Sequence, residues 1–232
     1  MKNILITGAS SGIGAQIAEV LAKRNDVFLT GRRKVHSIKY CACDFSDISS
    51  IKQMYKSAIE YFNSDVDVLI NCAGQYIYKP IEYMSCEEIS YLVDVNFKSA
   101  YILAGLVIPA MRTKKWGRII NIGSISGVVG EANASLYSAT KSALMGMTKA
   151  LALEVANDNI TVNTINPGWV DTPLVQNSLN EVEKQEVIDV TPQRRFVEPI
   201  EIAHLCEYLI SQSAKGITGQ GINLCAGLTC GC

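Results

Sequence analysis

The chain has 232 residues, 48% of them apolar, and a formal net charge of −1. This length suits a single α/β domain, and the apolar content excludes intrinsic disorder because it is enough to bury a large core. Runs of Lys and Arg do not exceed three residues, which argues against the basic patch typical of nucleic-acid binding.

Secretion and membrane insertion are not expected either. Met1 and Lys2 lead directly into a strand-like segment, which leaves no room for a signal peptide. The longest apolar run, Ala100–Met111, is too short to span a bilayer and is flanked by Lys98 and Arg112. We therefore expect a cytoplasmic protein.

The eight cysteines indicate reduced thiols, several of them in the cores of strands or helices, because none forms a C-x-x-C pair and no secretory signal precedes them. Cys225, Cys230 and Cys232 cluster near the end of the chain, but they lack the spacing and the fourth ligand that zinc sites usually need. We predict no metal site, and we expect His36 and His204 to be surface residues.

The first predicted unit is a strand, a glycine-rich turn and a helix. Asn3–Thr7 is a short apolar strand, and residues 8–14 read Gly-Ala-Ser-Ser-Gly-Ile-Gly before a helical pattern begins. Glycines let the backbone approach a ligand, and a helix N-terminus offers unpaired N–H groups and the positive end of its dipole. The unit predicts a diphosphate-binding turn.

The second strand, Val27–Thr30, ends at Gly31-Arg32-Arg33. In a dinucleotide-binding fold, an acidic residue at this place binds the 2′-hydroxyl of NAD, whereas an arginine accommodates the 2′-phosphate of NADP. The carboxylate is missing and two guanidiniums are present, so the sequence favours NADP. The alternative is that both arginines are solvated loop charges.

The next crossover is short. Only Lys34–Lys39 separates the second strand from a third, Tyr40–Cys43, whereas a full crossover helix needs a dozen or more residues. Asp44 follows this strand, near where an adenine would lie. A helix over Asp47–Phe62 comes next, then a buried strand over Val66–Ile70 that is closed by the small residues Asn-Cys-Ala-Gly at 71–74.

The middle of the chain reads as one long helix, Ser85–Met111, with an N-cap signal at Ser85. Asn96 stands in its interior, where Asn is unfavourable because its side chain competes for backbone hydrogen bonds. It is either tolerated through exposure or retained for function. The strand Arg118–Ile122 follows and delivers Gly123 and Ser124 at its carboxyl end, where open α/β sheets bind ligands.

A helix over Ser135–Ala156 carries Tyr137 and Lys141, which stand one turn apart on the same face. An ammonium beside a phenol favours the phenolate and lowers the phenol's pKa from its reference of about 10. Such a tyrosine can donate and accept a proton near neutral pH, and Ser124 could hold a substrate oxygen beside it. The alternative is an amphipathic helix that happens to carry both residues.

The remaining elements complete the predicted fold. A strand over Ile160–Ile165, a helix over Pro199–Ser211 and a last strand over Gly221–Leu224 follow, and the polar stretch Pro173–Arg195 is a candidate lid. Strands alternate with helices without a linker. We predict an α/β fold with a single domain over residues 1–232, in which helices cover both faces of a Rossmann-type, doubly wound parallel sheet of about seven strands, with the lid at about residues 171–195.

These segments together resemble the short-chain dehydrogenase/reductase family across nearly the whole chain, and in particular its 3-oxoacyl-[acyl-carrier-protein]-reductase-like members. Seven motifs match in order and spacing. They are TGASSGIG (Thr7–Gly14), CDFSD around Asp44, NCAG (Asn71–Gly74), VNFKSAY around Asn96, NIGSISG around Ser124, YSATK (Tyr137–Lys141) and NPGWVDTPL (Asn166–Leu174).

The resemblance implies a catalytic set of Asn96, Ser124, Tyr137 and Lys141. Tyr137 would be the general acid in reduction and the base in oxidation, and Lys141 would lower its pKa and bind the nicotinamide ribose. Ser124 would hold the substrate carbonyl oxygen. Asn96 would order a water that links Lys141 to bulk solvent. The cofactor would carry the hydride chemistry, which the protein aligns with the carbonyl.

The resemblance also implies the cofactor contacts. The glycine turn would hold the diphosphate, Arg32 the adenosine phosphate, and Asp44 with Phe45 the adenine. The full predicted set is Gly8, Ser10, Ser11, Gly12, Ile13, Gly14, Arg32, Arg33, Asp44, Phe45, Asn71, Ala73, Gly74, Tyr137, Lys141, Pro167, Gly168, Val170 and Thr172.

Three features depart from the family pattern. The short crossover at Lys34–Lys39 exposes the adenine side, and the glycine turn carries no basic residue, so the NADP preference rests on Arg32 and Arg33. Near the end of the chain, Cys225-Ala226-Gly227 stands where the family usually has an acidic residue and two glycines, which bears on assembly because the last strand often packs against another subunit.

The predicted function is NADPH-dependent, reversible reduction of a ketone or 3-oxoacyl-type carbonyl to an alcohol, with Tyr137 as proton donor. One alternative is an NAD-dependent dehydrogenase of a sugar, polyol or secondary alcohol. Another is a non-catalytic, cofactor-binding regulatory protein, whose mark would be a lost Tyr or Lys. The expected partner is a small-molecule or acyl-carrier-bound substrate. We also expect a homo-oligomer, a tetramer or dimer, formed through Ala100–Met111 and the small-residue face of Ala139, Ala143 and Gly146.

The substrate is left open by the sequence. It depends on the side chains of residues 75–80, 127–134 and 171–195. Glu131 and Asn133 indicate a polar substrate, whereas Leu174, Val175 and Leu179 indicate an apolar one.

Overall fold

The computed structural model describes residues 1–33 and 39–230, and its centre is a seven-stranded sheet in which all neighbouring strands are parallel. The spatial order is β3-β2-β1-β4-β5-β6-β7, so the direction of winding reverses between β1 and β4. Open sheets of this kind bind ligands at the carboxyl ends of the strands beside such a switch point. The strands are β1 Asn3–Thr7, β2 Asp26–Gly31, β3 Tyr40–Ala42, β4 Val68–Asn71, β5 Gly117–Ile122, β6 Ile160–Pro167 and β7 Gly221–Leu224.

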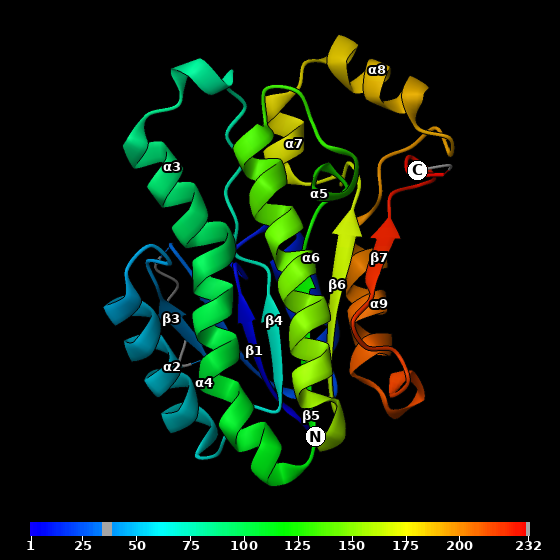
Figure 1. Cartoon of the computed structure of the whole chain (residues 1–232). Helices are drawn as coiled ribbons and strands as arrows, with labels where there is room; N and C mark the ends of the chain where they lie inside the picture. The colour runs from blue at the N-terminus through cyan, green and yellow to red at the C-terminus, as the bar shows by residue number, and fades with distance from the viewer. Residues whose placement is uncertain (34–38, 231–232) are drawn as a thin grey trace.

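Helices cover both faces of this sheet (Figure 1). Helices α1 (Gly12–Leu21) and α9 (Pro199–Ile210) pack on one face, where Ile4 and Ile6 of β1 join their core. Helices α2 (Ile48–Phe62), α4 (Ser99–Lys114) and α6 (Ser135–Val155) cover the other face, where Leu5 points. Because parallel strands are buried on both sides, they read as continuous apolar runs. The predicted doubly wound α/β domain is confirmed.

The predicted starts of two helices are confirmed because their capping side chains form the expected hydrogen bonds. The Asp47 carboxylate accepts hydrogen bonds from the backbone N–H groups of Ser49 and Ser50 and so begins α2. Ser85 and Glu88 form a reciprocal capping box at the start of α3 (Cys86–Val93), as the N-cap signal predicts. The predicted short crossover at Lys34–Lys39 falls largely outside the described residues.

The predicted single helix Ser85–Met111 is wrong in one respect. The stretch divides into α3, a π-helical turn at Asp94–Lys98 and α4. Asn96 lies in the π turn, where its side chain bonds to another segment instead of competing with its own helix. The whole stretch Cys86–Lys114 is long and apolar enough to cross a membrane by length and composition, but Leu103 and Val107 pack in the core against the sheet.

The candidate lid is helical. It contains α7 (Pro173–Ser178) and α8 (Glu181–Val190), which stand beyond the carboxyl ends of the strands in Figure 1. None of the residues of α8 is buried, in agreement with the polar sequence of this stretch. Its action as a lid stays a prediction.

A buried polar chain joins the inner strands to α6. The Asn71 side-chain amide donates to Asn121 Oδ1 (2.9 Å), and the Asn121 amide donates to Thr148 Oγ1 (2.9 Å). Thr148 in turn shares a hydrogen bond of 2.7 Å with Thr164 of β6. All four residues are at most 5% exposed, so these bonds satisfy groups that water cannot reach.

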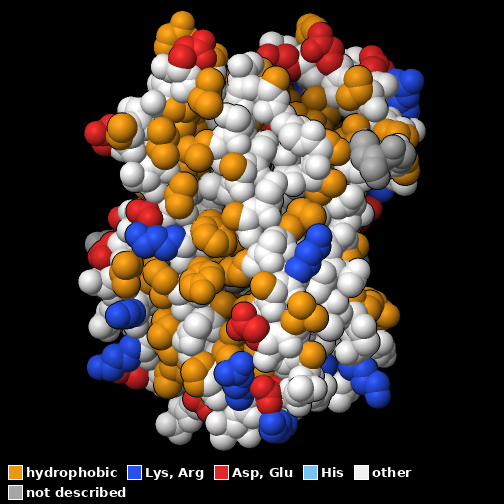
Figure 2. Space-filling view, in the orientation of Figure 1, with side chains coloured by type: hydrophobic (Ala, Val, Ile, Leu, Met, Phe, Trp, Pro, Cys, Tyr) orange, Lys and Arg blue, Asp and Glu red, His pale blue; other side chains and the backbone are white. Residues whose placement is uncertain are grey.

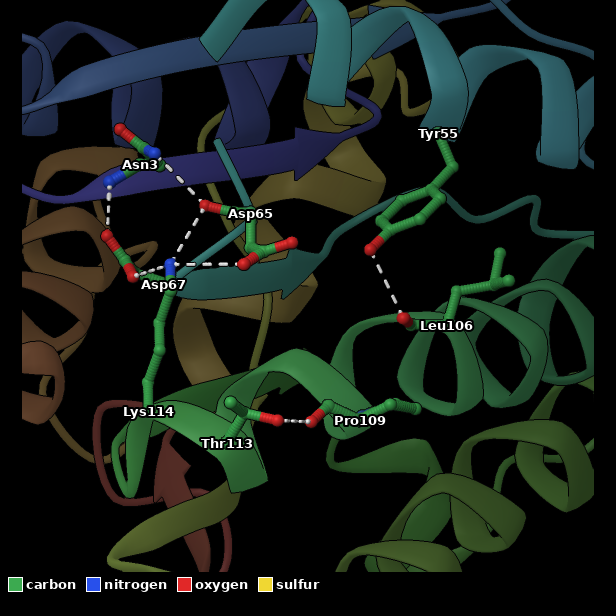
Figure 3. A network of polar contacts seen from close by, with 8 residues as sticks. All are labelled: Asn3, Tyr55, Asp65, Asp67, Leu106, Pro109, Thr113 and Lys114. Atoms are coloured by element: carbon green, nitrogen blue, oxygen red, sulfur yellow. Dashed lines mark hydrogen bonds and ion pairs between the residues drawn. The ribbon is translucent and has the colours of Figure 1, made fainter. Parts of the chain in front are cut away.

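A second polar network lies at the amino ends of strands β1 and β4 (Figure 3). The backbone N–H of Asn3 donates to Asp67 Oδ2 (3.0 Å), and Lys114 Nζ lies 3.0 Å from Asp67 Oδ1. Tyr55 of α2 donates to the carbonyl of Leu106 in α4 (3.1 Å). These contacts fix the amino ends of β1 and β4 against α4, away from the candidate site.

Apolar side chains gather on the outer face formed by α4 and α6 (Figure 2). Tyr101 of α4 and Leu153 of α6 are 62% and 83% exposed. The predicted subunit interface on these helices stays a prediction.

Candidate active site

A cavity of about 530 Å³ opens at the carboxyl ends of the strands around the β1–β4 switch point. It brings together many of the residues proposed from the sequence. These are Gly8, Ser10, Ser11, Gly12, Ile13, Gly14, Arg32, Arg33, Phe45, Ala73, Gly74, Tyr137, Lys141 and Thr172.

The glycine turn forms one wall of this cavity. Gly8 has a φ of +68°, and a Cβ placed on it would lie 2.8 Å from the backbone N of Ala73, so only glycine fits there. The N–H of Ala9 donates to the Thr30 carbonyl (3.0 Å), which ties the turn to β2. Ser11 stands at the N-cap of α1, but its side chain makes no capping bond. The first N–H groups of α1 therefore remain available to an anion, which fits a diphosphate.

The two arginines lie at the end of β2. Arg32 donates to the Tyr91 hydroxyl (3.1 Å), and both arginines line the cavity. A second cavity of about 310 Å³ lies beside Arg32, where Asp44, Tyr91 and residues 42–43 complete its lining. Hydrogen bonds from Ser46 hold the pKa of Asp44 below its ordinary value, and the Arg32 charge adds to this effect. Cationic groups thus face the place predicted for the adenosine phosphate.

Lys141 lies deep in the opposite wall. Its Nζ donates to the Ile122 carbonyl (2.8 Å) and lies 5.6 Å from the centre of the Tyr137 ring. The residue is only 5% exposed, and burial lowers the pKa of its ammonium to about 8.

The predicted lowering of the Tyr137 pKa is wrong for the structure without cofactor. Burial raises the pKa of this phenol to about 12, and hydrogen bonding with Ser124 only partly opposes the rise. The reason is that desolvation of the phenolate outweighs any benefit from Lys141, whose ammonium bonds to a carbonyl instead. Tyr137 is therefore protonated near neutral pH.

Ser124 is held by its neighbours at the end of β5. Its Oγ accepts from the backbone N–H of Ser126 (3.1 Å) and donates to Ser126 Oγ (3.0 Å). The Ser126 hydroxyl donates in turn to Glu131 Oε2 (2.7 Å). A Cβ on Gly123 would overlap Asn166, so this strand end packs closely against β6.

Comparison with known proteins agrees with this geometry. A sequence profile described as short chain dehydrogenase matches residues 2–183. The chain belongs to the short-chain dehydrogenase/reductase family. This short-chain dehydrogenase is an NAD(P)-dependent oxidoreductase, and it is similar to 3-oxoacyl-[acyl-carrier-protein] reductases, as the resemblance predicts.

Two curated relatives illustrate the range of the family. The chain is 34% identical over 238 residues to the 3-oxoacyl-[acyl-carrier-protein] reductase of Vibrio cholerae, covering 98% of this chain and 97% of the relative. It is 33% identical over 251 residues to D-beta-hydroxybutyrate dehydrogenase of Cupriavidus necator, with 97% of each covered.

Two solved structures are also similar to this chain over nearly its whole length. A variant of actinorhodin polyketide ketoreductase with NADPH superposes with a TM-score of 0.91 at 32% identity, covering 97% of this chain and 96% of that one. A 4-hydroxyisoleucine dehydrogenase complexed with NADH has the same TM-score at 31% identity, with both chains fully covered. Relatives of this short-chain dehydrogenase therefore bind either nicotinamide cofactor.

Asn96 of the dehydrogenase lies buried in the π turn, next to the lining residues Gly74 and Gln75. Its Oδ1 accepts from the Gln75 N–H (2.7 Å), and its Nδ2 donates to the Gln75 carbonyl (2.9 Å) and to Thr140 Oγ1 (3.2 Å). A Cβ on Gly74 would lie 3.4 Å from Lys141 Nζ and 3.6 Å from Asn96 Oδ1, so the two groups flank this glycine. π turns of this kind occur frequently at functional sites.

Other predicted residues lie outside the cavity lining, and the predicted catalytic residues Asn96 and Ser124 are among them. Asn71 is 5% exposed and bonds to Asn121, and Val170 is 5% exposed and pairs with Val197. Asp44 lines the smaller cavity. Pro167 ends β6 and accepts from the Ile125 N–H, and Gly168 follows it beside Cys225.

Some lining residues of this dehydrogenase had no assigned role in the sequence. They are Gly31, Cys72, Val95, Ile122 and Gly123, whereas Pro173, Asn177 and Ser178 belong to the predicted lid. Gly31, Cys72 and Gly123 lie at strand ends, a signal that could have found them. Over residues 1–33 and 39–230, no three His, Cys, Asp or Glu side chains are grouped as a metal site requires, and Cys232 lies outside that part.

Proposed function

We propose that the protein is an NADPH-dependent carbonyl reductase that converts a ketone to an alcohol reversibly. The observation that carries the proposal is that Tyr137 and Lys141 line the same cavity as a glycine turn with free helix N–H groups. A nicotinamide cofactor bound along that turn supplies the hydride. The side chains opposite supply the proton and orient the carbonyl.

Tyr137 is the proton donor in this proposal. Its pKa of about 12 keeps the phenol protonated at neutral pH, as reduction requires. Ser124 turns its hydroxyl toward the substrate oxygen while Ser126 N–H still donates to its Oγ (3.1 Å). Lys141 stabilises the phenolate that forms when the proton leaves, because it is the positive charge beside the ring.

Asn96 is a positioning residue in this proposal. By bonding both backbone groups of Gln75, it fixes the segment that follows Gly74 at the cavity wall. That segment flanks Lys141, so the water that is expected to link Lys141 to solvent would lie beside it. The protein acts as a single domain over residues 1–232, and α7 and α8 close over the substrate.

NADP(H) is the proposed cofactor. Arg32 and Arg33 line the cavity at the end of β2, and no carboxylate stands between Gly31 and Lys39 in the sequence. A guanidinium suits a 2′-phosphate, whereas the 2′-hydroxyl of NAD is usually held by an acid. A second candidate is an NAD-dependent alcohol dehydrogenase, which the similarity to a 4-hydroxyisoleucine dehydrogenase with NADH supports.

The test is turnover of a panel of neutral ketones and 3-oxoacyl thioesters with NADPH or NADH, followed by absorbance at the reduced nicotinamide. The wild type is expected to turn over at least one ketone with NADPH. Tyr137→Phe, which removes only the hydroxyl, should lower kcat by about 10²- to 10⁴-fold while cofactor binding persists. Absence of turnover across the panel, or a Tyr137→Phe variant as active as wild type, would overturn the proposal.

A further inference from the structure

Glu131 is an unexplained carboxylate beside the proposed reaction centre. Its Oε2 accepts from Ser126 Oγ (2.7 Å) and its Oε1 from the Tyr76 hydroxyl (2.6 Å). Ser126 bonds directly to Ser124, so the carboxylate stands two hydrogen bonds from the residue proposed to hold the carbonyl oxygen. Neither donor carries a charge, and two carboxylate oxygens can accept about four hydrogen bonds.

Within residues 1–33 and 39–230, the carboxylate of Glu131 has no basic side chain as an ion-pair partner. Lys79, which follows the nearby tyrosines in sequence, instead contacts Glu88 at 2.8 Å. Glu131 is half-buried, and a partly desolvated carboxylate without a counter-ion favours a cation supplied from outside.

Aromatic rings surround the same place. The Tyr76 ring meets the Tyr137 ring edge-on at 4.9 Å and stacks with Tyr78 at 6.4 Å between centroids. The hydroxyl of Tyr76 is bound by Glu131, and that of Tyr78 accepts from Asn133 (3.0 Å). Tyr76 and Tyr78 are nevertheless 38% and 61% exposed, so their rings remain accessible. Aromatic faces beside a carboxylate form the environment that recognises ammonium groups.

We propose that Glu131 determines specificity, and that the substrate is a ketone carrying a positively charged amine or quaternary ammonium group that lies against Glu131 and the rings of Tyr76 and Tyr78. The inference rests on the proposed carbonyl reduction and narrows its substrate class. The same carboxylate repels substrates that carry a carboxylate, because like charges in a partly desolvated site are unfavourable.

The experiment compares three ketones of matched shape that end in trimethylammonium, tert-butyl or carboxylate, each with two- to four-carbon spacers. The trimethylammonium and tert-butyl groups differ in charge but hardly in size. For the wild type with saturating NADPH, we expect kcat/KM to be at least tenfold higher for the cationic ketone than for its neutral isostere. The carboxylate should be at least tenfold worse than the isostere.

Glu131→Gln removes the charge and keeps the shape. It should lower the ratio of cationic to neutral kcat/KM at least tenfold, and the wild-type ratio should fall as salt is added. Glu82→Gln, which removes an exposed carboxylate four residues beyond Tyr78 in the sequence, is the matched control and should leave the ratio unchanged. A ratio that responds equally to both variants would show a general surface potential and overturn the inference.

Other outcomes are equally decisive. If the neutral ketone is reduced but the wild-type ratio is near one, the substrate class is wrong while the carbonyl reductase stands. If Glu131→Gln lowers kcat/KM for all three ketones in proportion, Glu131 only positions Ser126, and the inference fails. If no ketone is reduced at all, the proposed function itself fails and the inference falls with it.

Discussion

The two sides of the cavity are built from different parts of the chain. The glycine turn in the cavity wall is shaped by backbone contacts: Gly8 packs against the main chain of residues 72–73, and Ala9 bonds to the Thr30 carbonyl. Near Ser124 the contacts are instead made by side chains: Ser126, Glu131 and Tyr76 form a hydrogen-bonded row, and Tyr76 of this row lines the cavity. Backbone surfaces suit a cofactor shared by many relatives, whereas side chains can change the substrate without moving the fold.

The largest effect expected from this contrast follows from substituting Gly8. Gly8→Ala places a Cβ at 2.8 Å from main-chain atoms in a left-handed conformation, so the turn must shift. We expect the affinity for NADPH and NADH to fall together by at least about 30-fold, and the free energy of unfolding to fall by about 2 kcal/mol. Fluorescence titration and urea unfolding measure both quantities.

Gly146→Ala is the matched control for that variant. Gly146 lies inside α6 with nothing within 4 Å of an added Cβ. Alanine is favoured over glycine in a helix, so this variant should gain about 0.5–1 kcal/mol. If Gly8→Ala and Gly146→Ala lost equal cofactor affinity and equal free energy of unfolding, the close packing at Gly8 would not be the cause.

The buried ammonium of Lys141 is expected to lower the free energy of unfolding. Its pKa falls from 10.5 to about 8 on folding, so the folded protein holds this charge at a cost below pH 8. Between pH 8 and 10.5 the unfolded chain binds more protons than the folded one, and the cost disappears as the pH rises. Lys141→Met should therefore stabilise the protein by about 2 kcal/mol at about pH 7, and the gain should vanish once the pH exceeds 10.5.

Urea unfolding of wild type and Lys141→Met at several pH values measures this difference. The variant should also lose most of its activity, which would make the stabilised protein the less active one. A variant that is less stable than wild type at neutral pH would contradict the account, because it would mean that the Nζ bond to Ile122 outweighs the cost of the buried charge.

The smallest of these effects concerns the choice between cofactors. Arg32→Ala should weaken NADPH binding about tenfold and leave NADH binding within about twofold, because only NADPH carries the 2′-phosphate. The ratio of the two dissociation constants is the measurement. An unchanged ratio would favour the NAD-dependent alternative and separate Arg32 from cofactor selection.

The sequence predicts well those features that depend on neighbouring residues in the chain. Glycine spacing, strand runs and capping residues are local signals, so β1, its turn and the starts of α2 and α3 are found at the predicted places. Tyr137 and Lys141 are found on one helix face because their separation is itself a helical period.

The rest depends on contacts that no local pattern encodes. The π turn around Asn96 exists because Gln75, from a distant segment, offers both backbone groups to one side chain. Whether the Tyr137 pKa is raised or lowered depends on how deeply the phenol is buried, and the Tyr-x-x-x-Lys spacing does not reveal this burial. In the sequence, Glu131 indicates only a polar substrate, because its contacts with Ser126 and Tyr76 depend on the fold.

The buried chain from Asn71 through Asn121 and Thr148 to Thr164 has a consequence for motion. It fastens α6, and with it Tyr137 and Lys141, to three inner strands, so α6 can separate only when the sheet itself opens. Helix α8 has no buried residue and can detach at little cost. Native-state hydrogen exchange should find α6 amides among the slowest in the molecule and α8 amides among the fastest. The helix that carries Tyr137 and Lys141 should therefore be among the last parts of the protein to open, and α8 among the first.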